Sequence, residues 1–172
     1  MEATFAPELS RLINLERIFH NRSQYAITAS EMERIALARR FDLISLDILE
    51  AKYDVNPSET PRGGFYVIGK LHATVVQSCV VTLAPVMEEI NADISIHVID
   101  EKYALENSLD PDSGEDFEYS VHGEIDLGEI TAQYLCLSLN PYPRAPGADQ
   151  DPTLEKFKDK KNPFTVLEKL KP

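Results

Sequence analysis

Two neighbouring segments of the chain alternate between apolar and polar residues, which is typical of strands with one buried face. They cover residues 42–55 and 65–76, and the first is apolar on much of both faces. The stretch between them, 56–64, is rich in turn-forming residues. Two long strands joined in this way predict an antiparallel hairpin. One face of the second strand is expected to carry Phe65, Val67, Leu71, Ala73 and Val75.

Two other segments carry the sequence signals of a helix start. The first helix is predicted to begin after Thr28 or Ser30, because each opens a capping box with a Glu three residues later. The second is predicted to begin after Asp126, and the Pro-rich segment 140–147 ends it because proline cannot continue a helix. The apolar side of this second helix is expected to contain Leu127, Ile130, Tyr134 and Leu137.

The remaining apolar runs predict shorter elements. Residues 79–83 are expected to form a third strand and residues 92–99 a fourth, while 84–91 suits either a continued strand or a short helix. Residues 10–18 suit an edge strand or a short helix, and we favour the strand. Residues 101–118 are predicted to form an acidic loop, because they contain little apolar material. The sum is an α+β fold, a mostly antiparallel sheet with helices packed against it.

The C-terminal part of the chain differs from the rest in composition. We predict a single α+β domain over residues 1–140, followed over 141–172 by a Pro/Lys-rich linker and a short C-terminal helix. That helix would begin at Asn162, with Pro at its first helical position. It either docks on a partner protein or packs on its own domain. The candidate docking side chains are Phe164, Leu167 and Leu170.

Charge is distributed unevenly along the chain, which has a formal net charge of −12. Residues 86–130 contain 14 acidic residues and one Lys, whereas residues 11–40 contain six Arg and three Glu. Affinity for nucleic acid rests on neutralising phosphates with Lys and Arg. The balance therefore argues against tight, nonspecific binding of RNA or DNA by the whole surface.

Two local contacts remain open. A basic face formed by the Arg-rich region would suit RNA, and the acidic stretch would suit a basic protein, of which ribosomal proteins are the most abundant in a cytosol. The acidic stretch is also explained as a solvated loop that keeps the protein in solution. The candidate RNA-facing residues are Arg11, Arg17, Arg22, Arg39 and Arg40.

The chain lacks the motifs by which common catalytic and cofactor sites are recognised. It contains no Walker-type phosphate loop, GxGxxG, GxSxG, CxxC or HExxH. We therefore predict no catalytic residue, no metal and no cofactor. A hydrolase or other enzyme site assembled in space from His72, His97 and nearby acids is a further hypothesis.

Nothing in the sequence predicts export or insertion into a membrane. No segment approaches the roughly 20 apolar residues that cross a bilayer. The N-terminus has Glu2 and Glu8 where a signal peptide carries positive charge. We expect a cytoplasmic protein in which Cys79 and Cys136 are reduced and buried as small apolar side chains.

The most specific motifs resemble one known family. Residues 123–127 (GEIDL), the helix and Pro-rich exit after them, and residues 162–170 (NPFTVLEKL) resemble the YceD family, called large ribosomal RNA subunit accumulation proteins. The stretch 69–83 is similar to the central strand and cysteine segment of that family. Many members carry Cys-x-x-Cys there, whereas this chain has Cys79 at the first position and Thr82 at the second. This form resembles the alphaproteobacterial branch.

The resemblance implies a non-catalytic factor in the accumulation of large-subunit ribosomal RNA, and hence in ribosome biogenesis. Its partner would be a pre-ribosomal particle, bound through large-subunit ribosomal RNA or through a basic ribosomal protein. Neither DNA nor a membrane is expected as a partner. The alternative is a general protein-interaction module that docks through its C-terminal helix, and the sequence leaves the oligomeric state open.

Overall fold

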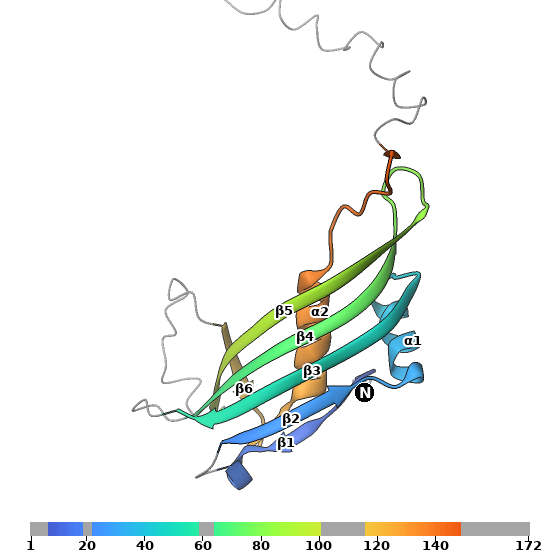
Figure 1. The fold of residues 1–172 in the computed structure, drawn as a ribbon. Coiled ribbons are helices and arrows are strands. Elements are labelled where there is room, and N and C mark those ends of the chain that lie inside the picture. Colours follow the sequence, from blue (N-terminus) through green and yellow to red (C-terminus); the bar gives the residue numbers. More distant parts are fainter. Residues whose placement is uncertain (1–6, 19–21, 59–63, 101–115, 149–172) are drawn as a thin grey trace, which may run out of the picture.

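A helix, α2, lies across one face of a five-stranded sheet, and no described helix covers the other face, called the open face below (Figure 1). The structure is a computed structural model that describes residues 7–18, 22–58, 64–100 and 116–148. The sheet has the order β2-β3-β4-β5-β6, and β1 pairs with β7 in a separate two-stranded sheet. All pairs are antiparallel except β5–β6, so the α+β prediction is confirmed. The elements are β1 (Leu12–Asn14), the 3₁₀ helix η1 (Leu15–Ile18), β2 (Ser23–Thr28), α1 (Glu31–Arg40), β3 (Ser45–Pro57), β4 (Phe65–Ser78), β5 (Pro85–Asp100), β6 (Asp116–Ser120), β7 (Glu124–Asp126) and α2 (Leu127–Ser138).

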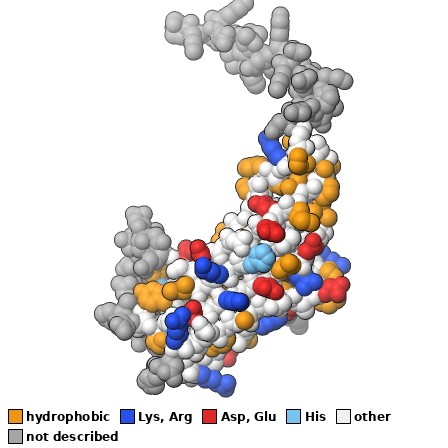
Figure 2. Space-filling view, in the orientation of Figure 1, with side chains coloured by type: hydrophobic (Ala, Val, Ile, Leu, Met, Phe, Trp, Pro, Cys, Tyr) orange, Lys and Arg blue, Asp and Glu red, His pale blue; other side chains and the backbone are white. Residues whose placement is uncertain are grey.

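The predicted hairpin of β3 and β4 is confirmed, and its alternating pattern sorts the side chains between two faces. Val55, Val67 and Val75 are fully buried in the core, whereas Lys52 and Lys70, opposite each other in register, are exposed. Figure 2 shows the open face, where charged side chains of both signs are interspersed and apolar ones gather towards the end that carries the β4–β5 turn. The hydrophobic driving force therefore acts on one face of the sheet only.

A bulge explains why the start of β3 is apolar on both faces. The register shifts between Leu46 and Ile48, so that Leu46 and Leu49 are both buried although they lie three residues apart. Strict alternation would place these two leucines on opposite faces. Ile48 is left 41% exposed.

The expected strand at 79–83 is wrong, because this run forms the turn between β4 and β5. The N–H of Leu83 donates to the carbonyl of Cys79 at 3.0 Å, and Leu83 has a φ of +61°. Val80 and Leu83 are 49% and 76% exposed, so Cys79 is the one residue of this run that is buried. The expected fourth strand is confirmed as part of β5, which is 16 residues long and also includes residues 85–91.

The prediction of an acidic loop over 101–118 is wrong for its last three residues. Residues 116–118 belong to β6, which pairs with β5 in parallel. Aromatic contacts hold this edge of the sheet: the ring of His97 stacks on Tyr66 at 4.5 Å and lies 5.7 Å from the ring of Phe117. The sequence did not predict this strand, because the segment 101–118 is acidic and the residues that hold 116–118 in the sheet lie far away in sequence. Residues 101–115 lie outside the described residues.

Both predicted helix starts are confirmed. α1 uses the second of its two capping boxes, in which Ser30 and Glu33 bond to each other's backbone N–H. α2 begins after Asp126, whose side chain accepts from the N–H groups of Gly128 and Glu129. Leu137, the last residue of the expected apolar side of α2, is 80% exposed, because the buried face of the helix runs through Leu135 instead.

The Pro-rich segment after α2 packs back on the β4–β5 turn. The carbonyl of Pro143 accepts from the N–H of Val80 at 2.9 Å, and Ala148 is buried. Cys79 is buried as expected, and the backbone N–H of Ala145 chiefly lowers the pKa of its thiol to about 6. Cys136 is exposed on α2, which corrects the expectation that both cysteines are buried.

The segment 10–18 contains both alternatives that the sequence left open, since β1 is followed directly by η1. The predicted C-terminal helix, with Phe164, Leu167 and Leu170, lies outside the described residues. The boundary between residues 140 and 141, the linker and the docking role of that helix stay predictions.

Candidate functional site

Arg11 and Arg40 form ion pairs that connect separate elements. Arg11 binds Glu33 through both guanidinium nitrogens, with Nη1 2.8 Å from Oε1. Arg40 binds Glu129 on α2 at 2.7 Å and Glu8 at 3.0 Å. Arg11 holds the pKa of Glu33 down at about 2, and Glu129 chiefly raises the pKa of Arg40. Both charges are therefore compensated within the fold.

The other three candidate arginines are exposed, and of these Arg22 alone forms an ion pair with a described residue. Arg22 contacts Asp54 across the β2–β3 pair, with Nη2 2.8 Å from Oδ2. Arg17 lies in η1 and Arg39 in the last turn of α1, and neither forms a salt bridge with a described residue. No described residue compensates the charge of Arg17 or Arg39, and contact of any of the five arginines with RNA stays a prediction.

The histidines of the enzyme hypothesis do not converge. His72 faces Asn91 in the register of β4 and β5, and its Nδ1 lies 3.2 Å from Asn91 Oδ1. His97 faces Tyr66, which is six positions from His72 along β4, or roughly 20 Å. Within the described residues, no three His, Cys, Asp or Glu side chains are arranged to hold a metal ion.

A groove that the sequence did not predict opens between β6 and β7. The two strands are joined by a tight hairpin turn, in which Val121 and Glu124 exchange two backbone hydrogen bonds of 3.0 Å. His122 and Gly123 between them have φ of +52° and +73°, as a type I′ turn requires. Gly123 was the available sequence signal, and it is a weak one, because the pairs that mark such a turn are Asn-Gly, Asp-Gly and Gly-Gly, whereas this chain has His-Gly.

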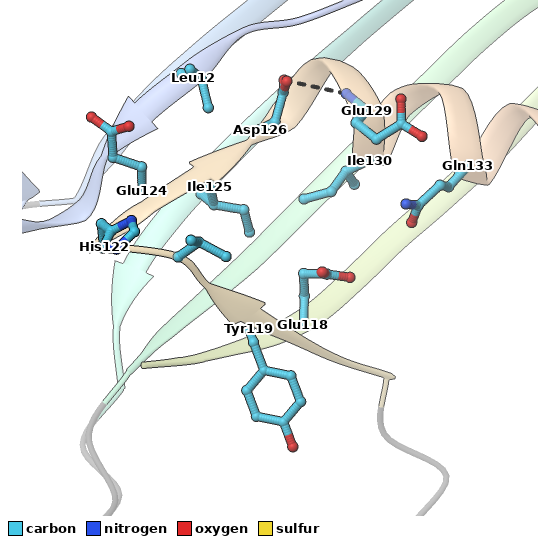
Figure 3. Close-up of a pocket in the computed structure, with 11 residues that line it drawn as sticks. Leu12, Glu118, Tyr119, His122, Glu124, Ile125, Asp126, Glu129, Ile130 and Gln133 are labelled. Atoms are coloured by element: carbon cyan, nitrogen blue, oxygen red, sulfur yellow. Dashed lines mark hydrogen bonds between the residues drawn. The ribbon is translucent and has the colours of Figure 1, made fainter. Parts of the chain in front are cut away.

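Beyond this turn the two strands separate instead of pairing. β6 joins the large sheet beside β5, and β7 pairs with β1, so that the hairpin opens like a wedge (Figure 3). The opening has a volume of about 330 Å³. Ile125 and Ile130, both buried, lie on its inner side, and Leu12 and Val121 add apolar side chains that are 64% and 55% exposed.

Four carboxylates surround this apolar groove, and they differ in how far they are compensated. Asp126 caps α2, and Glu129 binds Arg40. Glu118 on β6 and Glu124 on β7 form no salt bridge with a described residue. The residues that line the groove include neither Lys nor Arg. The groove therefore combines accessible apolar side chains with uncompensated negative charge.

An α+β protein with an acidic surface groove is the class that this fold and site define. Among the described residues, no helix is long and apolar enough to span a membrane. The family model of the large ribosomal RNA subunit accumulation protein YceD matches residues 67–171, and the chain belongs to this family. The match begins in β4, so β1 to β3 and α1 precede it. Neither a curated protein nor a solved structure matches the chain.

Proposed function

We propose that this protein supports accumulation of large-subunit ribosomal RNA as a non-catalytic factor that binds a basic ribosomal protein in a pre-ribosomal particle. The family description supplies the role in RNA accumulation. The uncompensated carboxylates Glu118 and Glu124 beside exposed Leu12 and Val121 are the observation that favours a basic protein as the direct contact. Carboxylates repel a phosphate backbone, whereas they attract the Lys and Arg residues of a ribosomal protein.

A sucrose-gradient profile of cells with and without the gene tests this proposal. We expect a deficit of large subunits without the gene, and the tagged protein on large-subunit precursors. A normal profile, with the protein only at the top under conditions that preserve precursors, would contradict the role.

Paired variants in the same gradient distinguish the two contacts. Glu118→Lys with Glu124→Lys is expected to release the protein from the precursors, whereas Arg17→Gln with Arg39→Gln is expected to leave it bound. The opposite result would make RNA the direct contact.

A further inference from the structure

One side of the groove is bounded by an edge of β6 that has no strand partner among the described residues. β6 pairs there only with β5, whereas β7 pairs with β1, and the backbone N–H and C=O of Glu124 on its other edge already bond to Val121. On an edge strand, backbone N–H and C=O groups that point away from the neighbour are free to pair with another chain. β6 thus presents one such edge to the opening, and β7 and the start of α2 lie on its other side (Figure 3).

The side chains of the groove indicate what would fill it. An added strand beside β6 would point alternate residues towards α2, where apolar Ile130 and the carboxylate of Glu118 face each other (Figure 3). Glu124, Leu12 and Val121 line the rest of the opening. A second copy of this chain is disfavoured at this site, because it would bring the same carboxylates against each other.

We propose that the groove between β6 and β7 binds an extended segment of a protein partner that contains both basic and apolar residues, as a strand added to the edge of β6. β6 contributes five residues, or about 16 Å of edge. The backbone hydrogen bonds would supply affinity, and the carboxylates would select Lys and Arg. This inference rests on the proposed function, because it names the chemistry by which the basic ribosomal protein is bound.

Peptide binding to the purified full-length protein tests the inference. The probe is a fluorescent peptide of about eight residues that alternates Lys and Val, and its control alternates Lys and Pro, which keeps the charge and removes half of the backbone N–H donors. We expect the Lys-Pro peptide to bind about tenfold more weakly or worse. We also expect slower amide exchange in β6 when the Lys-Val peptide is bound.

Charge-reversal variants locate the contact. Glu118→Lys and Glu124→Lys are each expected to weaken binding of the Lys-Val peptide about tenfold. Glu89→Lys on the open face of β5 is the matched control, since it makes the same change in net charge far from the groove. Circular dichroism of each variant confirms that it is folded.

Three results would overturn the inference: no binding of the Lys-Val peptide, equal binding of both peptides, or an equal loss with Glu89→Lys. Binding of an oligouridylate that depends on Glu118 and Glu124 would also overturn it. The gradient experiment is independent of these results. If the wild-type protein lies on precursors but does not bind the peptide, this inference fails and the proposed function stands. If the protein binds the peptide but is not found on precursors, the proposed function is refuted and peptide binding at the groove stands.

Discussion

At the scale of single residues, Glu33 connects a helix start to a distant segment. Its carboxylate accepts from the N–H and the hydroxyl of Ser30, and it binds Arg11, which lies 22 residues earlier. The capping box was evident in the sequence, because both of its residues lie within four positions. The ion pair between Glu33 and Arg11 was not evident in the sequence, because it depends on the position of the segment before β1 in the folded protein.

Replacing Glu33 makes this coupling measurable as a pH-dependent stability. Glu33→Gln keeps a side chain that can close the capping box but loses the charge opposite Arg11, so we expect a loss of about 1 kcal/mol at pH 7. The pKa of Glu33 is lowered from 4.5 to about 2 in the folded protein, so the ionised form is the stabilising one. The stabilisation is complete above about pH 4.5 and disappears as the pH falls towards 2.

Urea unfolding between pH 3 and 7 measures this difference, with Glu31→Gln as the control in the same helical turn. A difference between wild type and Glu33→Gln that stays constant as the pH falls would show that the ion pair does not stabilise the fold.

Gly128 is a second residue whose role depends on distant neighbours. It lies in the first turn of α2, and a Cβ added there would be 2.7 Å from the carbonyl oxygen of Leu9 and 2.9 Å from the N of Arg11. Helix propensity predicts that Ala stabilises by about 1 kcal/mol, whereas the backbone contact predicts a loss of about 1–3 kcal/mol. We expect Gly128→Ala to destabilise, measured as the urea midpoint. A raised midpoint would mean that the segment before β1 moves freely away.

At the scale of elements, the β6–β7 turn decides whether the groove keeps its shape. Its type I′ geometry places Gly123 at a positive φ, where a Cβ is disfavoured. The strands on either side pair with different sheets, so among the described residues this turn alone joins their facing ends. The long β3–β4 hairpin, by contrast, is stabilised by its own register and by core burial on one face.

Gly123→Ala is therefore expected to affect both stability and binding. The positive φ should cost about 1 kcal/mol, and loosening of the turn should weaken binding of the Lys-Val peptide. Gly147→Ala is the matched control, because Gly147 also has a positive φ, of +79°, but lies outside the groove. Equal weakening of peptide binding by both variants would show that the turn does not shape the site.

At the scale of the whole molecule, Arg40 ties together three parts of the fold. It projects from the last turn of α1 and binds Glu129 on α2 and Glu8 before β1. A cluster of this kind fixes how the helices and the N-terminal segment sit together. A loss of function in an Arg40 variant would therefore indicate a folding defect, and it would not by itself identify a binding surface.

Comparison of neighbouring arginines separates these two effects. We expect Arg40→Gln to lower the free energy of unfolding by about 1 kcal/mol, with a smaller loss at high salt, because the side chains are partly exposed. Arg39→Gln removes the same charge at the adjacent position and should leave stability nearly unchanged. Thermal unfolding at low and high salt measures both, and equal effects of the two variants would contradict a structural role for Arg40.

The sequence by itself determined the features that depend on near neighbours. Alternation predicted the faces of β4, the capping residues Ser30 and Asp126 marked both helix starts, and the closing motif pointed to the family. Each of these signals lies within a few residues, so local propensity and hydrophobic pattern suffice to identify it.

Only the tertiary structure decided where apolar and charged residues lie relative to distant parts of the chain. The run 79–83 is apolar yet forms an exposed turn, and β6 is acidic yet forms a strand because β5 and an aromatic cluster hold it. The groove exists because the arms of one hairpin pair with different sheets. Such pairings join residues far apart in sequence, and their free energy depends on burial and hydrogen bonds that form only in the folded chain.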